Sequence, residues 1–141
     1  MEFSKLERAA IEQILSKPMN GMDGLRRQFE AASVVKREYT GVGFYTTVSV
    51  PSSVPPVEEY VELQEQLQYG AGATIRSDPH EMVAFKLWTN AGYIACLEGV
   101  TTNNFWPDES EIDVVACRLE RREERKPQSW IRRLFARMTR E

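Results

Sequence analysis

The spacing of the apolar residues changes once along this chain, and that change restricts the fold to one class. Over residues 4–16 the apolar side chains recur at helical spacing, as Leu6, Ala10 and Ile14 illustrate. Over residues 44–50 they alternate with polar residues, which is the period of a half-buried strand. Because the helical patterns precede the alternating ones, we predict an α+β fold, with an N-terminal helical pair packed on an antiparallel sheet of about five or six strands.

Capping and breaking residues set the limits of the expected elements. Ser4 with Glu7 fits a capping box at the start of the first helix, and Pro18 ends that helix. Asp23 is the expected cap of a second helix, which reaches Ala32. Strands are expected over residues 34–39, 44–50, 82–89, 93–98 and 112–119, residues 60–67 fit either a strand or a helix, a bend is expected at Gly70-Ala71-Gly72, and turns are expected at Asp78-Pro79 and Asn90-Ala91-Gly92.

The composition is that of a soluble globular domain. The chain has 141 residues, of which 42% are hydrophobic and 28% are charged. Its longest apolar run is far shorter than the ~20 residues of a membrane-spanning helix. No secretory signal is visible, and two cysteines make no disulfide framework. We therefore expect a reduced, cytoplasmic protein.

Charge divides the chain into two parts. Residues 1–117 hold nine Lys and Arg against 17 Asp and Glu, a net charge of −8, whereas residues 118–141 carry +5. We expect a single acidic domain over residues 1–119, a charged linker over 120–127 and a basic segment over 128–141. Because Lys and Arg dominate affinity for phosphates, nucleic-acid binding by residues 1–117 is disfavoured.

The basic segment has the pattern of an amphipathic helix over residues 128–141. We expect its apolar stripe to be buried against protein, either this domain or a second copy in a homodimer. Attachment to a membrane surface is the less favoured alternative, because anionic lipid would repel the acidic domain. The stripe consists of Trp130, Ile131, Leu134, Phe135 and Met138, and Arg132, Arg133 and Arg137 lie outside it.

One set of residues suggests a pocket. Glu98 ends an expected strand, His80 is the only histidine, and the aromatic side chains of Phe105 and Trp106 follow in a loop. If the four converged, they would suit a small hydrolase or a ligand-binding protein. A dyad of Cys96 and His80 is a weaker nucleophilic option.

The sequence predicts neither a metal site nor a cofactor. Structural zinc needs four Cys or His ligands, and the chain has two cysteines and one histidine. The acidic run with Asp108, Glu109, Glu111 and Asp113 lacks the spacing of a calcium loop. Gly70-Ala71-Gly72 lacks the third glycine of a dinucleotide site.

Three local patterns together resemble a family of small uncharacterised bacterial proteins. They are Tyr39-Thr40-Gly41-Val42-Gly43-Phe44-Tyr45-Thr46, Leu97-Glu98-Gly99 and Trp106-Pro107, in that order after a helical pair. The resemblance implies an α+β fold over roughly residues 4–116, and it implies no activity or catalytic residues. In size and charge the chain is also loosely similar to immunity proteins that neutralise bacterial toxins.

No complete catalytic set stands out in the sequence, so a non-enzymatic role is favoured. We expect a protein-binding module whose acidic face recognises a basic protein partner, with an immunity-type role as one concrete form. Charge complementarity of this kind speeds association and sets specificity.

Overall fold

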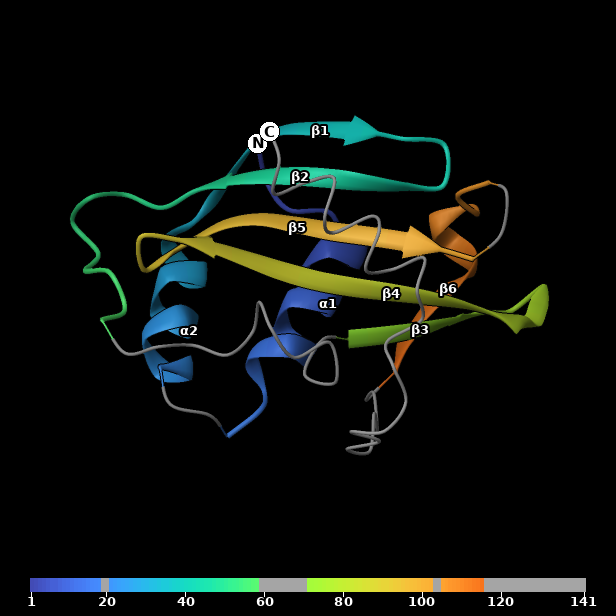
Figure 1. Cartoon of the computed structure of the whole chain (residues 1–141), viewed down its shortest axis with the longest axis horizontal. Helices are drawn as coiled ribbons and strands as arrows, with labels where there is room; N and C mark the ends of the chain where they lie inside the picture. The colour runs from blue at the N-terminus through green and yellow to red at the C-terminus, as the bar shows by residue number, and fades with distance from the viewer. Residues whose placement is uncertain (19–20, 59–70, 103–104, 116–141) are drawn as a thin grey trace.

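The computed structural model describes residues 1–18, 21–58, 71–102 and 105–115. Two α-helices pack on one face of a curled, six-stranded antiparallel sheet (Figure 1). This arrangement confirms the α+β class, the N-terminal helical pair and the antiparallel sheet.

The first helix, α1, spans Lys5–Leu15 and begins at the predicted capping box. The backbone N–H of Glu7 donates to Ser4 Oγ at 3.1 Å, and the backbone N–H of Ser4 donates to Glu7 Oε1 at 2.7 Å. These reciprocal bonds satisfy two donors that the helix start leaves without partners. The apolar side of α1, with Ala10, Ile11 and Ile14 fully buried, faces the sheet.

The second helix, α2, spans Met22–Ala31 and begins differently from the prediction. Its N-cap is Gly21, whose φ of 86° turns the chain into the helix without any side-chain cap. The predicted capping role of Asp23 is therefore wrong. Because the N-cap lies two residues earlier than expected, Asp23 lies within the first turn, where its carboxylate accepts a hydrogen bond from Arg26.

The sheet has the strand order β1-β2-β5-β4-β3-β6, and every neighbouring pair is antiparallel. A single-turn 3-10 helix, η3 (Glu109–Glu111), precedes the last strand. The N-terminal residue also pairs with an edge strand, because Val34 N–H donates to Met1 O at 2.9 Å and the Met1 ammonium donates to Val34 O at 3.1 Å. The strands are β1 (Ser33–Tyr39), β2 (Gly43–Ser49), β3 (Ala71–Ile75), β4 (Asp78–Asn90), β5 (Tyr93–Thr101) and β6 (Ile112–Val115).

Two turns were predicted in the wrong place. Ala71 and Gly72 do not form a bend but begin β3, which is hydrogen-bonded to β4 on one side and β6 on the other. The turn expected at Asp78-Pro79 lies at Arg76 and Ser77, because Asp78 already pairs with Ile75. A register shift beside Ile75 accommodates the proline, which donates no ladder hydrogen bond.

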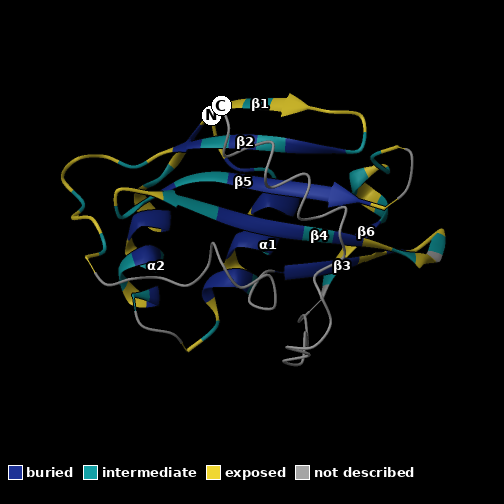
Figure 2. Ribbon diagram, in the orientation of Figure 1, coloured by how far each residue is buried: buried dark blue, intermediate teal, exposed yellow. Residues whose placement is uncertain are grey.

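The hydrophobic core lies between the helices and the sheet. Figure 2 shows that buried residues occur in both helices and in the central strands of the sheet. A buried amide also links the two layers, since Gln28 Nε2 on α2 donates to Gly92 O at 2.8 Å and Gln28 Oε1 accepts from Ile94 N–H at 2.9 Å. The apolar residues of the hydrophobic core include Leu6, Ala10, Ile11, Ile14, Met22, Leu25, Phe44, Val83, Phe85, Leu87 and Leu97.

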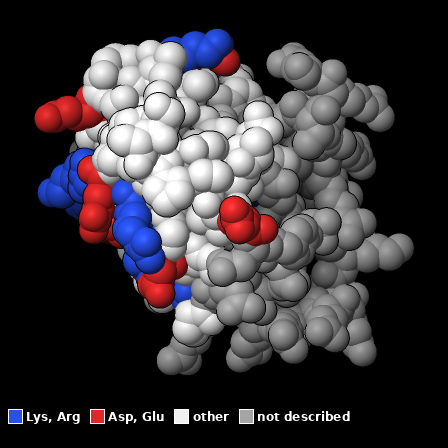
Figure 3. Space-filling model, turned by 90° about the vertical axis from the view of Figure 1, so that its left-hand side faces the viewer, with Lys and Arg blue, Asp and Glu red and all other residues white. Residues whose placement is uncertain are grey.

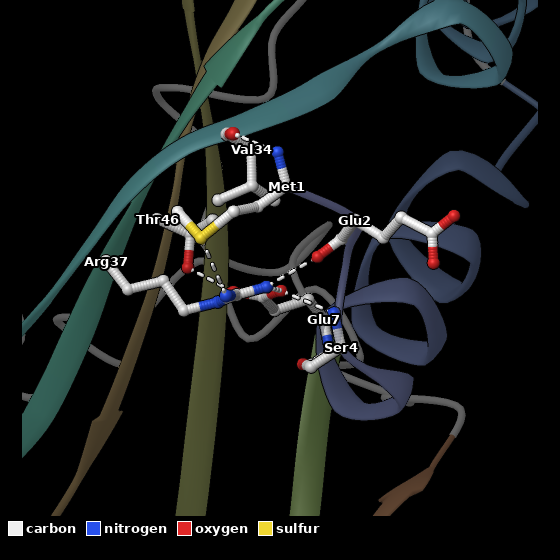
Figure 4. A network of polar contacts seen from close by, with 7 residues as sticks. All are labelled: Met1, Glu2, Ser4, Glu7, Val34, Arg37 and Thr46. Atoms are coloured by element: carbon white, nitrogen blue, oxygen red, sulfur yellow. Dashed lines mark hydrogen bonds and ion pairs between the residues drawn. The ribbon is translucent and has the colours of Figure 1, made fainter.

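A buried carboxylate joins α1 to the first two strands. Glu7 accepts hydrogen bonds from Arg37 Nε and Nη2, both at 2.8 Å, and from the Thr46 hydroxyl (Figure 4). Burial tends to raise the pKa of Glu7, but the bonds from Arg37, Thr46 and Ser4 outweigh it and leave that pKa lowered. Glu7 is therefore held as an anion within the structure.

Several predictions fall outside the described residues. They concern the segment 60–67, the linker over 120–127 and the amphipathic helix over 128–141. Among the residues that the structure does describe, no helix is long and apolar enough to cross a membrane.

Removing the Glu7 carboxylate tests this link. Glu7→Ala leaves the Arg37 guanidinium without its buried partner, and we expect a loss of ~3–5 kcal/mol in the free energy of unfolding. Glu12→Ala, at an exposed position of the same helix, is the matched control and should cost about 0.5 kcal/mol or less. Urea titration followed by circular dichroism measures both, and equal losses in the two variants contradict the assigned role of Glu7.

Candidate functional site

The four residues of the predicted pocket lie in different parts of the fold. Glu98 on β5 pairs with Lys86 on β4, and both side chains lie on the sheet face away from the helices, here called the outer face. Trp106 packs on the helix side, where its ring is 5.1 Å from that of Phe44. The side of Phe44 follows from Thr46, two residues further along β2, whose hydroxyl reaches Glu7 on α1.

His80 does not approach Glu98. His80 lies on β4 six residues before Lys86, which places it about 20 Å along the strand from the partner of Glu98. The side chain of Phe105 is 76% exposed. The structure therefore does not bring Glu98, His80 and Trp106 together, and it leaves the Phe105 side chain exposed.

The alternative dyad of Cys96 and His80 is not formed either. Cys96 pairs with Trp88, eight residues beyond His80 on β4 and hence about 27 Å from it along the strand. Burial, with a smaller contribution from the nearby Glu98, raises the pKa of the Cys96 thiol to about 12. At neutral pH this thiol is protonated and is a poor nucleophile.

Glu98 is the most unusual ionisable group among the described residues. It is 1% exposed, and neither carboxylate oxygen has a hydrogen-bond partner of ordinary geometry. Burial raises its pKa to about 8, although the Lys86 ammonium and the Trp88 indole both act to lower that pKa. The Lys86 ammonium itself lies 4.0 Å from the centroid of the Trp88 ring. Glu98 is therefore largely protonated at neutral pH in the folded protein.

The three patterns behind the family resemblance meet in space. Phe44 is the strand partner of Gly99, and a Cβ at Gly99 would overlap with the Phe44 ring. Trp106 then packs edge-on against Phe44, and its backbone N–H donates to Gly41 O at 2.6 Å. Phe85 completes the cluster, 6.3 Å from Phe44 and 6.4 Å from Trp106. The patterns thus build an aromatic cluster that holds the loop after β5 against the β1–β2 turn.

Negative charge is concentrated at the end of the molecule next to this loop. Six carboxylates and Arg76 surround the β3–β4 turn and η3, a net charge of −5, and the other described residues carry eight acidic and eight basic side chains. On the opposite end, charges of both signs mix along one side and the remaining described surface is mostly uncharged (Figure 3). We call the first region the acidic end; its carboxylates belong to Asp78, Glu81, Asp108, Glu109, Glu111 and Asp113.

Local hydrogen bonds fix the geometry of the acidic end. Arg76 Nε donates to Asp113 Oδ2 at 3.0 Å, and Arg76 N–H donates to Glu111 O at 2.9 Å, which ties the β3–β4 turn to η3. Asp108 caps η3 by accepting from Ser110 N–H at 3.0 Å, and bonds from Ser110 lower the pKa of Asp108. Burial raises the pKa of Glu109, which lies near Glu7 and Arg37. These contacts hold most of the carboxylates in place; Arg76 lies among them, and Arg37 lies near Glu109.

Exposed apolar side chains lie among these carboxylates. Tyr39 is 62% exposed at the end of β1, close enough to Glu109 for that carboxylate to raise the tyrosine pKa, although burial is the larger cause. Met82, next to Glu81 on β4, is 53% exposed, and Phe105 lies in the loop before Asp108. Aromatic residues and Met are enriched at protein–protein interfaces. The acidic end therefore combines the charge and the apolar side chains of an interface.

Metal binding has no support within the four described stretches, where no three His, Cys, Asp or Glu side chains are placed to share an ion. The negative charge can be counted from the sequence but its location cannot. Met82 and Arg76 were not expected at a site, and Tyr39 entered only as the first residue of the Tyr39–Thr46 pattern. The signal that bears on them is topological, because antiparallel pairing of β3 with both β4 and β6 brings residues 76–82 beside 108–113.

The contact of Phe44 with Gly99 gives a stability prediction. Gly99→Ala forces the Phe44 ring to shift, and we expect a loss of ~1–3 kcal/mol or more from overpacking. In a Phe44→Leu background the same substitution should cost clearly less, because the ring is gone. Thermal unfolding of the four proteins measures this coupling, and purely additive losses exclude the assigned contact.

Glu98 gives a pH prediction. Because its folded pKa is raised, the folded state gains a proton relative to the unfolded state, and stability is lost as pH rises from about 4.5 towards about 8. Relative to Glu98→Gln, the wild type should lose up to ~1.4 kcal/mol per pH unit in that window. Lys86, Tyr45 and Cys96 lie on the same face and are unchanged in the comparison. Denaturant titrations between about pH 5 and pH 8.5 test it, with Glu12→Gln as the exposed control; parallel pH profiles of wild type and Glu98→Gln refute it.

We compared the chain with known proteins, and the result bears on how a function can be assigned. The assignment rests on the geometry of the acidic end, because the comparisons supply no relative. No family model, curated protein or solved structure matches the chain.

Proposed function

We propose that this protein is a non-enzymatic protein-binding module whose acidic end recognises a basic protein partner. The observation that carries the proposal is the location of charge: the acidic end holds a net −5, and the rest of the described residues are neutral in sum. A single-sign patch of this kind attracts an oppositely charged partner and increases its association rate.

The apolar side chains at the acidic end provide the contact area that charge alone does not. Phe105 and Tyr39 are large and exposed, and the aromatic cluster beneath them fixes the loop that bears Phe105. Binding energy at interfaces is concentrated in a few aromatic or Arg anchors surrounded by polar contacts. We expect Phe105 and Tyr39 to be such anchors, with the carboxylates around them selecting a basic partner. An immunity-type role, in which the partner is a basic toxin, is one concrete form.

We further propose that residues 128–141 form an amphipathic helix that packs on protein rather than on lipid. The support is the apolar stripe through Trp130, Leu134 and Phe135, together with the acidity of the adjoining domain, which anionic lipid would repel. A helix of this length is marginal on its own in water, so its stripe needs a surface to bury against.

The experiment compares two charge variants of equal size in affinity capture from a native lysate. Asp108→Asn/Glu111→Gln/Asp113→Asn removes three charges from the acidic end and keeps a hydrogen-bond acceptor at each position. Glu2→Gln/Glu12→Gln/Glu30→Gln removes three charges elsewhere and serves as the control. We expect the wild type and the control to capture the same basic protein at low salt, and the acidic-end variant to retain at most about a tenth of it.

A second pair of variants tests the aromatic anchor. Phe105→Ala should reduce capture of the same protein, whereas Val35→Ala, an exposed apolar residue on β1, should leave it unchanged. Mass spectrometry identifies the captured protein and its charge. Capture of no basic protein, or equal capture by the acidic-end variant, refutes the proposed function.

A further inference from the structure

The outer face of the sheet is buried at its centre although neither described helix packs on it. Both helices lie on the opposite face (Figure 1). On the outer face, Glu98 is 1% and Lys86 is 5% exposed, and Val100 is also buried. Residues on an uncovered sheet face are normally solvated. The burial of two ionisable side chains therefore indicates that a further segment covers this face.

We propose that residues 128–141 of this chain cover the outer face, with the stripe of Trp130, Leu134 and Phe135 packed over Glu98 and Lys86. The inference builds on the amphipathic helix proposed above, and it concerns a different face from the acidic end. The inference identifies the outer face as the surface on which that helix docks.

The dimensions of the chain allow this placement. The last described strand, β6, ends at Val115 on one edge of the sheet, and β3 and β4 separate it from β5. Three strand spacings amount to ~14 Å, and the 12 residues of 116–127 reach up to ~40 Å when extended. A helix of 14 residues is ~21 Å long. It is therefore long enough to cross the four strands from β3 to β2.

The chemistry of the face suits this occupant. Besides Glu98 and Lys86, the outer face presents Tyr45, Trp88 and Cys96, which match an apolar stripe bordered by arginines. Residues 59–70 are the other stretch outside the described ranges that is long enough to cover it. They hold three glutamates and no Lys or Arg, whereas residues 128–141 hold four arginines and one glutamate. The arginines of residues 128–141 lie outside the apolar stripe, so this segment can bury five apolar side chains without burying a charge.

Cys96 provides a direct readout, because its half-buried thiol lies on the covered face. In a Cys117→Ser background, a maleimide reagent reports access to this single thiol. Trp130→Ser/Phe135→Ser should increase the labelling rate of Cys96 by about tenfold or more, since buried thiols react only when exposed. Arg132→Gln/Arg140→Gln, outside the stripe, is the control and should change that rate little. Circular dichroism checks that every variant remains folded.

The outcomes separate the possible occupants. A wild-type labelling rate that is independent of protein concentration supports this chain's own segment, whereas a rate that falls as concentration rises assigns the cover to a second copy. Protection that persists in the stripe variant overturns the proposal in favour of residues 59–70. Exposure of Cys96 on adding anionic vesicles would assign the stripe to lipid instead. None of these results depends on capture by the acidic end, so the two proposals fail independently.

Discussion

The carboxylate of Glu7 is the interaction on which the layered structure depends. One side chain caps the start of α1, pairs with Arg37 on the edge strand and accepts from Thr46 on the next strand. An anion buried at this depth is tolerated only because every one of these donors is present. The position of the helix over the sheet is therefore specified by polar geometry, while the surrounding apolar side chains supply most of the burial. Gln28 has the same function at the start of β5, where it connects α2 to the hairpin.

The packing that stabilises the fold also shapes the surface at the acidic end. Phe44 lies over Gly99, Trp106 packs on Phe44, and the backbone of Trp106 is bonded to Gly41. The loop that follows Trp106 leads directly into η3 and its carboxylates. The packing of Trp106 on Phe44 and its hydrogen bond to Gly41 hold this loop in place. Its charged and aromatic side chains are therefore presented on a rigid support, which lowers the entropic cost of binding.

Local sequence patterns predicted local structure. They failed where contacts between residues that are distant in the sequence determine the structure. The capping box at Ser4 and Glu7 and the alternation in β2 depend on neighbours, and both were predicted correctly. The capping of α2 was not, because Gly21 reaches a positive φ that makes a side-chain cap unnecessary. Glu7 and Arg37 are 30 residues apart, so their pairing has no signal in a single sequence. The supposed pocket failed because alternation along β5 places Glu98 on the face opposite Trp106.

The pairing of Met1 with Val34 affects how this sheet meets other chains. An open edge strand is a template for further strands and hence for aggregation. On β1, the N-terminal residue already occupies both backbone groups of Val34, and a register shift follows before Lys36. Lys36 and Glu38 then form an ion pair along the same strand. The backbone groups at the start of this edge are therefore already hydrogen-bonded. Two copies that meet at β1 have few backbone groups left with which to extend the sheet.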